Sequence, residues 1–153
     1  MSKNNHIAER DVEIMRRLIK YTWDRALENK TFTGAFIVKD NKVIQKAITS
    51  IEIDNNPLAH AELKALQAAI SQHGPELVGC QLYTTQRPCP MCASAVAWSG
   101  VDKVVYGLRH SDYQWATFGD IHNFLESLGV VCIGPVLEKE CKDIDNYLIA
   151  HGI

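Results

Sequence analysis

Residues 80–107, CQLYTTQRPCPMCASAVAWSGVDKVVYG, carry the pattern on which the expected fold rests. The run 80–85 is a short β-rich segment, and the run 89–99 is helical and ends at Gly100. A second β-rich segment, KVVYG, follows at 103–107. A strand, a helix and another strand in direct succession favour the α/β class.

The flanking sequence extends this alternation. Residues 34–49, GAFIVKDNKVIQKAIT, predict a β-hairpin that turns at KDNK, and residues 58–74 predict a helix stopped by Gly74-Pro75. We therefore predict one domain over residues 1–153, a three-layer α/β/α fold with a mixed sheet of about five strands covered on both faces. The remaining predicted elements are helices at 8–27, 121–129 and 137–152 and a short strand at 130–134.

The composition is that of an ordinary globular protein, with 46% apolar and 22% charged residues. The 16 basic and 18 acidic residues leave a formal charge of −2, which gives no electrostatic footprint for DNA or RNA. No apolar run approaches the roughly 20 residues of a membrane helix, and the N-terminus lacks a signal-peptide pattern. Five cysteines, an odd number, do not make a closed disulfide framework. We expect a reduced, cytoplasmic protein without membrane association.

Two cysteines, Cys89 and Cys92, lie three residues apart at the start of the predicted helix 89–99. Pro90 suits the first helical position, which makes Cys89 the predicted N-cap and puts both sulfurs on one helix face. The positive end of the helix dipole stabilises thiolates there, and two thiolates at one point favour zinc. Taken alone, the pair is equally compatible with a redox pair or with two core cysteines.

Two upstream residues strengthen the zinc interpretation. His60 lies near the start of the predicted helix 58–74, and Glu62 follows two positions later, off the face that His60 occupies. Three protein ligands, His60, Cys89 and Cys92, leave one position of a four-coordinate zinc open, as in catalytic sites. Water activated by the metal, with Glu62 moving its proton, would then attack an electron-poor carbon.

The motifs AHAE at 59–62 and RPCPMC at 87–92 resemble those of the cytidine deaminase superfamily, whose signature is H-x-E followed by P-C-x-x-C. The segments GAFIVKDNKVI and SGVDKVVYGLR resemble the superfamily's hairpin and its strand after the cysteine helix, so the likeness covers most of the chain. Within the superfamily, the chain looks most like the bacterial guanine deaminase and tRNA adenosine deaminase branch. The resemblance implies one zinc ion per chain, Glu62 as the catalytic proton shuttle and a homodimer.

The resemblance also implies substrate contacts. Trp98 is similar to an aromatic residue that small guanine deaminases place at the pocket, with a core or dimer-interface role as the alternative. Residues 110–120, HSDYQWATFGD, look like a family segment that ends in Phe and Asp, so Asp120 would contact a purine-like base or relay a proton. A helix cap before residue 121 is the alternative for Asp120. Ala61, inside the AHAE motif, and Thr49 are the other predicted substrate contacts.

Two positions depart from the family pattern. Thr49 stands where both branches usually carry an asparagine that holds the ring, and a hydroxyl offers fewer hydrogen bonds than an amide. Arg87 stands where the family usually has glutamate. We predict that Arg87 pairs with a loop carboxylate rather than bringing a cation to the pocket rim, because a cation near zinc would weaken metal binding. These changes leave the zinc chemistry intact and the identity of the ring open.

Three functions are compatible with this pattern. The first is a zinc-dependent hydrolytic deaminase of a small amino-substituted heterocycle, such as guanine, a related triazine or a nucleoside, releasing ammonia. The second is tRNA adenosine deamination, the same chemistry on a flipped-out loop base, which the balanced charge disfavours. The third is a non-catalytic, zinc-stabilised binding module. Glu62 argues against the third, because a structural zinc site does not need it.

Overall fold

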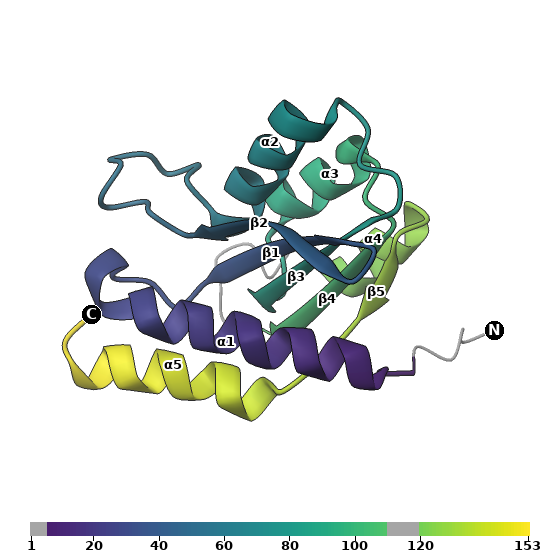
Figure 1. The fold of residues 1–153 in the computed structure, drawn as a ribbon. Helices are drawn as coiled ribbons and strands as arrows, with labels where there is room; N and C mark the ends of the chain where they lie inside the picture. Colours follow the sequence, from purple (N-terminus) through teal and green to yellow (C-terminus); the bar gives the residue numbers. More distant parts are fainter. Residues whose placement is uncertain (1–5, 110–119) are drawn as a thin grey trace.

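The computed structural model of the protein describes residues 6–109 and 120–153. Over these residues, helices and strands alternate after an opening helix and a hairpin (Figure 1). The elements, in chain order, are α1 (Glu9–Asn29), β1 (Gly34–Lys39), β2 (Lys42–Ile48), α2 (Ala61–His73), β3 (Cys80–Gln86), α3 (Pro90–Ser99), β4 (Lys103–Leu108), α4 (Ile121–Ser127), β5 (Val131–Ile133) and α5 (Glu138–Ala150).

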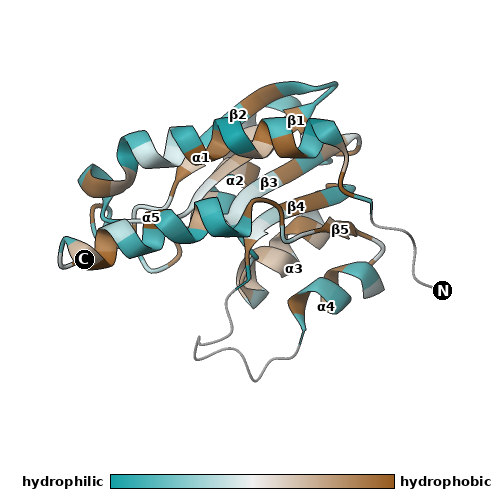
Figure 2. Ribbon diagram, turned by 90° about the horizontal axis from the view of Figure 1, so that it is seen from below, coloured by the Kyte–Doolittle hydropathy of each residue, from teal (hydrophilic) through white to brown (hydrophobic). Residues whose placement is uncertain are grey.

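The strands form one mixed sheet in the order β2-β1-β3-β4-β5. β1 pairs antiparallel with both β2 and β3, whereas β3, β4 and β5 run parallel to one another. Helices α1 and α5 lie side by side on one face, and α2, α3 and α4 cover the other (Figures 1 and 2). The predicted three-layer fold with a mixed five-stranded sheet is confirmed.

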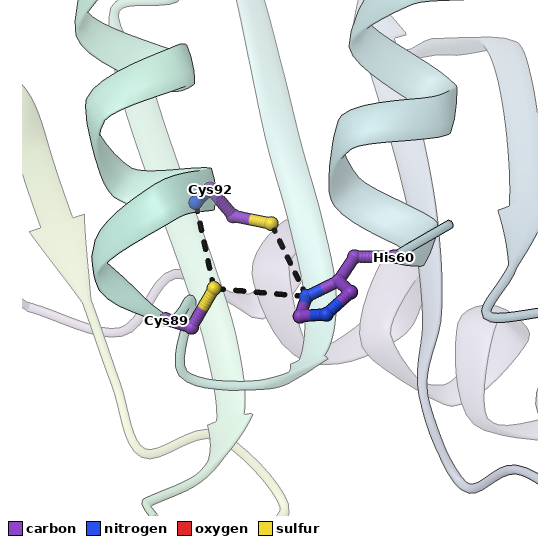
Figure 3. Close-up of side chains that lie close together, drawn as sticks. All are labelled: His60, Cys89 and Cys92. Carbon is purple, nitrogen blue, oxygen red and sulfur yellow. Dashed lines mark hydrogen bonds between the residues drawn. The ribbon is translucent and has the colours of Figure 1, made fainter. Parts of the chain in front are cut away.

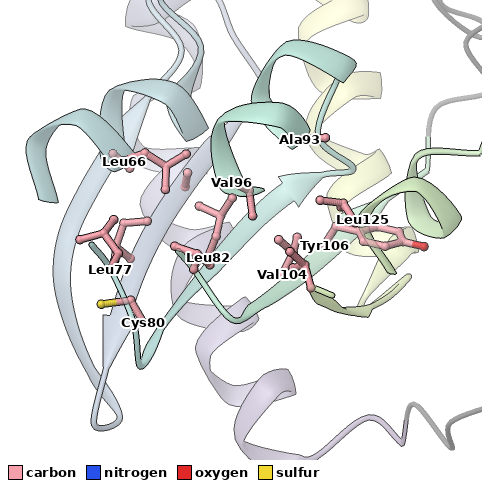
Figure 4. Close-up of a cluster of buried hydrophobic side chains, with 14 of the residues drawn as sticks. Leu66, Leu77, Cys80, Leu82, Ala93, Val96, Val104, Tyr106 and Leu125 are labelled. Atoms are coloured by element: carbon pink, nitrogen blue, oxygen red, sulfur yellow. The ribbon is translucent and has the colours of Figure 1, made fainter. Parts of the chain in front are cut away.

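The pleat of the strands sorts the buried side chains into two cores. Neighbouring residues Leu82 and Tyr83 of β3 are both fully buried, but they belong to different clusters. Leu82 packs with Leu66 of α2 and Val96 of α3, in the cluster drawn in Figure 4. Tyr83 packs on the opposite face with residues of α1 and α5. A sheet buried on both faces requires this doubled core, and Figure 2 shows hydrophobic and hydrophilic segments alternating along the covering helices α1 and α5.

The sheet also brings two helix starts together. α3 begins just after β3 ends at Gln86, and α2 begins at Ala61 after the long segment that follows β2. The backbone N–H of Leu77, after α2, donates to the carbonyl of Ser99 at the end of α3, which ties the far ends of the two helices together at 2.7 Å. The N-termini of both helices therefore meet near the carboxyl end of the central strand, where open α/β sheets bind ligands. No helix in the described ranges is both long and apolar enough to cross a membrane.

Candidate metal centre and active site

The start of α3 holds the two predicted thiol ligands. Cys89 is the N-cap, in an extended conformation, and Pro90 occupies the first turn. The Cys89 sulfur accepts a hydrogen bond from the backbone N–H of Cys92 at 3.5 Å, so the thiol replaces the oxygen of an ordinary cap. This capping arrangement was predicted from the proline, and it leaves Cys89 in the pocket wall while Cys92 is fully buried behind it.

The third predicted ligand comes from α2. His60 is the N-cap of this helix, and its Nδ1 lies 3.6 Å from the sulfurs of both Cys89 and Cys92 (Figure 3). The three ligand atoms lie within 4.8 Å of one another, and no other such group occurs in residues 6–109 and 120–153. Tetrahedral zinc, with bonds of about 2.3 Å to sulfur and about 2.0 Å to nitrogen, separates those ligands by about 3.5 Å. The donor set therefore fits one zinc ion.

The electrostatic environment of His60, Cys89 and Cys92, called the triad below, favours a bound cation. Hydrogen bonds from the Cys92 thiol and from His60 lower the pKa of Cys89 to about 4, so this sulfur is a thiolate at neutral pH. The shared hydrogen bond, followed by burial, raises the pKa of Cys92, which keeps its proton in the metal-free chain. The hydrogen bond to Cys89 also raises the pKa of His60. A bound cation would exchange with these protons, as thiolate and imidazole ligands require.

Glu62 lies beside the triad at the bottom of the pocket. Its side chain is 3% exposed, and its Oε2 lies 3.9 Å from the Cys92 sulfur. The hydroxyl of Thr84, on β3, lies 3.3 Å from Oε1 and fixes the carboxyl group from the other side. Burial raises the pKa of Glu62 to about 7. A carboxyl group with this pKa can both accept and return a proton near neutral pH.

The structure brings Thr49 next to these residues. Its hydroxyl accepts a hydrogen bond from the backbone N–H of Ala61 at 2.9 Å, and its own N–H donates to the carbonyl of Thr33. Thr49 lines the pocket, whereas Ala61 is fully buried and reaches it only through this backbone contact. The amide hydrogen of Ala61 is thus held by Thr49 where the resemblance predicted a substrate contact.

A pocket of about 710 Å³ opens from the triad. Besides His60, Glu62 and Cys89, its walls include Phe32 and Gln86, which the motifs did not indicate. The place of Gln86 in the pocket wall could have been predicted from the sequence, because this residue ends the strand that leads into the RPCPMC motif. The position of Thr84 on the same face of the sheet as Glu62 could also have been predicted, since Thr84 alternates with Leu82 along β3. Phe32 precedes its strand in a polar turn and carries no pattern of its own.

The structure places Trp98 on the solvent-exposed side of α3. The side chain of Trp98 is 90% exposed, and it is not among the described residues that line the pocket. The reason is helical geometry, because six residues carry it about 9 Å along the axis and roughly 240° around it from Cys92. Its alternative role, at an interface with another chain, stays a prediction.

Asp120 caps α4, accepting hydrogen bonds from the backbone N–H groups of His122 at 2.9 Å and Asn123 at 3.4 Å. Helix capping, the alternative given for this residue, is therefore what the structure shows. The rest of the 110–120 motif, residues 110–119, lies outside the described residues.

The Arg87 guanidinium lies 3.8 Å from the Asp120 carboxylate, as a paired arginine should. Its side chain is 15% exposed, and its backbone N–H donates to the carbonyl of Leu108 on β4. The predicted pairing with a loop carboxylate is found. Arg87 contributes to the pocket wall, but its charge is directed toward the N-terminus of α4.

A mixed α/β sheet and a His/Cys/Cys group with a buried carboxyl group beside it together define a zinc-binding α/β protein. The sequence matches the family described as cytidine and deoxycytidylate deaminase zinc-binding region over residues 8–108, which include His60, Glu62, Cys89 and Cys92. The chain belongs to this family.

Two similar proteins of known name are deaminases. The chain is 40% identical over 88 residues to the guanine deaminase of Bacillus subtilis (strain 168), a match that covers 57% of this chain and 56% of the relative. It is 33% identical over 132 residues to the tRNA-specific adenosine deaminase of the same organism, covering 83% and 81%. A protein solved in complex with 8-azaguanine superposes with a TM-score of 0.82 at 21% identity, over 92% of this chain and 85% of that one, and shows the same fold.

Proposed function

We propose that this protein is a hydrolytic deaminase of a small amino-substituted heterocycle, which it converts to the oxo compound with release of ammonia. The observation that carries the proposal is Glu62, buried at the bottom of the pocket with a pKa of about 7 and adjacent to the His60, Cys89 and Cys92 group. A structural zinc site would gain nothing from a buried carboxyl group, whose desolvation costs stability. This argues against a non-catalytic module.

The residues divide the work of the reaction. A zinc ion held by His60 and the two cysteines supplies the Lewis acidity that makes water a nucleophile near neutral pH. Glu62 takes one proton from the attacking water and delivers it to the ring nitrogen. It then takes the second water proton, from the hydroxyl group now on the carbon, and delivers it to the departing amine. The carbon gains an oxygen and loses its nitrogen as ammonia, so atoms balance with water alone. The Thr84 hydroxyl lies within hydrogen-bond distance of this carboxyl group, at 3.3 Å, and also of the Gln86 carbonyl, at 2.8 Å.

The ring is proposed to be a purine base, a related triazine or a nucleoside. Support comes from the relatives, one called a guanine deaminase and another solved with 8-azaguanine. The departure at Thr49 limits this argument to the ring class. Its hydroxyl is already an acceptor for Ala61, so it presents less hydrogen-bonding capacity to a base than a free amide would.

A second candidate is tRNA adenosine deamination. The specific observation in its favour is the 33% identity to the tRNA-specific enzyme over 83% of this chain. The formal charge of −2 argues against this candidate, because tRNA binding calls for positive surface that contacts phosphates. Gel-shift titration with tRNA at two salt concentrations separates the candidates, since salt-sensitive tight binding would favour the second.

The same proposal includes the cellular location and the assembly of the chain. Cys89 and Cys92 can bind a metal only while reduced, which suits a cytoplasmic location. We further propose that the chain acts as one domain and as a homodimer, with the exposed Trp98 among the surfaces available to a second copy.

The direct test measures ammonia release from guanine, adenine, cytosine, their nucleosides and simple amino-triazines, using protein with its metal content determined. The variant Glu62→Gln should keep about one zinc per chain and lose at least about a hundredfold in turnover, the usual contribution of a general acid–base residue. Glu76→Gln, at an exposed carboxylate after α2, is the matched control and should keep its activity. Full activity in Glu62→Gln would refute the assigned role.

A further inference from the structure

The pocket is larger than the ring that the proposed reaction needs. Its volume is about 710 Å³. Pockets of roughly 300–1,000 Å³ accommodate drug-sized ligands, whereas an amino-purine or amino-triazine has only about ten non-hydrogen atoms. A free base seated at the metal group would therefore leave most of the pocket to solvent. The remaining volume has room for a substituent on the ring.

Burial orders the pocket from its floor to its mouth. Glu62 is 3% exposed at the floor, whereas the side chains of Lys30 and Glu52 are 57% and 64% exposed. Two segments form the outer walls: residues 29–33, which join α1 to β1, and residues 49–57, which follow β2. Figure 1 shows the end of α1 and the long loop after β2 projecting on the same side of the molecule.

An ion pair joins these two segments. The Lys30 ammonium lies 3.5 Å from the Glu52 carboxylate. The backbone of Lys30 is held in the left-handed conformation that ends α1, with φ of 50° and its N–H donating to carbonyls of the last helical turn. An exposed ion pair contributes little to stability. Its position at the mouth therefore suggests a role in binding.

The chemistry of the outer walls favours a neutral, hydrogen-bonding group. Lys30 offers donors and Glu52 offers acceptors, and the hydroxyls of Thr31 and Thr33 belong to the same wall. The two charges cancel, so this region has no surplus of positive charge to attract a phosphate. A phosphate would also meet the Glu52 carboxylate directly. Hydroxyl groups, which both donate and accept, fit a wall of paired opposite charges.

We propose that the outer pocket is a subsite for a neutral, hydroxyl-bearing substituent of the ring, such as a glycosyl group, and that Lys30 and Glu52 are specificity-determining residues. This inference rests on the proposed function. The substrate is then nucleoside-sized, with the amino-bearing ring at the metal group and the hydroxylated substituent between residues 29–33 and 49–57.

The test compares one ring in three forms: free base, ribonucleoside and ribonucleoside 5′-monophosphate. Wild-type protein, Lys30→Met and Glu52→Gln are assayed for ammonia release, and the ratio of kcat/KM for nucleoside to that for base is measured. We expect the wild type to prefer the nucleoside. In either variant, the ratio should fall about tenfold, mainly through KM, as expected for losing one hydrogen bond to a charged group.

The matched control is Lys20→Met. Lys20 is paired with Asp24 on the same helix at 3.0 Å and is also exposed, but it is not among the described residues that line the pocket, so the nucleoside-to-base ratio should stay at the wild-type value. A wild type that prefers the free base, or a ratio unchanged in both variants, would overturn the inference while leaving deamination intact. Preference for the monophosphate would overturn it in favour of an anion site. No ammonia from any form would instead refute the proposed function.

Discussion

At the scale of single residues, the thiol and imidazole groups behave as one unit. The pKa of Cys89 is lowered first by the hydrogen bond from Cys92 and then by the one from His60, and the hydrogen bond to Cys89 raises the pKa of His60, so each residue's chemistry depends on its neighbours. The other three cysteines, Cys80, Cys132 and Cys141, are buried thiols whose pKa values burial raises. Position in the fold, not residue type, separates a ligand from a core thiol.

Cys89→Ala and Cys92→Ala should each lose the bound zinc and lower the Tm, because metal binding stabilises only the folded chain. Metal content by mass spectrometry and thermal unfolding by circular dichroism measure the two effects. Cys132→Ala, at a buried thiol outside the group, should keep about one zinc per chain even if it loses some stability. Stoichiometric zinc in either ligand variant would mean that other residues bind the metal.

Asp145 on α5 provides a test of pH dependence. It is 5% exposed, and burial raises the pKa of its carboxyl group from 3.8 to about 6, despite Lys142 at 3.6 Å and the amide of Gln86 at 3.4 Å. The folded chain therefore holds this proton more tightly than the unfolded chain does. The resulting stabilisation is complete below about pH 4 and is lost as the pH rises through about 6.

The variant Asp145→Asn lacks this titration. Relative to wild type, the free energy of unfolding of the variant should increase between pH 4 and pH 8, by at most about 3 kcal/mol, because only the wild type loses stability over this range. Urea denaturation at several pH values measures the change. Asp143→Asn, at an exposed carboxylate two residues earlier, corrects for removing one negative charge from α5. The same pH trend in both variants would show that burial of Asp145 is not the cause.

At the scale of elements, α1 approaches the sheet so closely that β1 must begin with glycine. A Cβ at Gly34 would collide with the hydroxyl of Thr22 on α1, which itself donates a hydrogen bond to the carbonyl of Leu18. The requirement is spatial and does not depend on glycine's backbone freedom. The sequence GAFIV gave no sign of it, since a strand can begin with many residues.

Gly34→Ala should lower the free energy of unfolding by about 2 kcal/mol, the usual cost of overpacking a tight contact. Thr22→Ala removes the atom that Gly34→Ala would strike. The double variant should therefore be more stable than the sum of the two single changes, a coupling that chemical denaturation can measure. Simple additivity would show that the strain lies elsewhere.

At the scale of the whole molecule, one buried polar group connects α1 to the centre of the sheet. Asp11 is 1% exposed and accepts hydrogen bonds from the hydroxyl of Tyr83 on β3 at 2.7 Å and from the ammonium of Lys103 on β4 at 2.9 Å. The three residues come from separate elements, so the group sets where α1 lies on the sheet. Because α1 ends at the pocket mouth, this placement also positions Lys30.

Lys103→Met should destabilise the fold by about 3 kcal/mol, because it leaves the buried Asp11 without its counter-charge. Replacing both residues, as Asp11→Asn with Lys103→Met, should recover part of that loss. Lys139→Met, which removes an exposed ion pair on α5, serves as the control and should change stability by less than about 1 kcal/mol. If Lys103→Met proves as mild as the control, the group does not secure α1.

Local patterns were enough to predict the fold class and the metal group. Alternating strands and helices produce an α/β sheet because each must bury its apolar face, and Pro90 starts a helix wherever the chain folds. His60, Glu62, Cys89 and Cys92 could be singled out because their residue types and spacing state their chemistry. For Trp98 and Asp120 the likeness in sequence left two roles each, and the structure adds the 90% exposure of Trp98 and the helix cap that Asp120 forms, while their contacts with substrate stay predictions.

The amino-acid sequence by itself therefore determined the layers of the fold and the kinds of atoms available to a metal and a proton. Only the tertiary structure decided that the His60 nitrogen lies 3.6 Å from both sulfurs, that burial brings the pKa of Glu62 to about 7, and that Lys30 meets Glu52 at the mouth. The reason is that spacing along a helix or strand follows from local geometry. Distances between segments far apart in the chain, and the solvent each group loses, depend on how all the elements pack together.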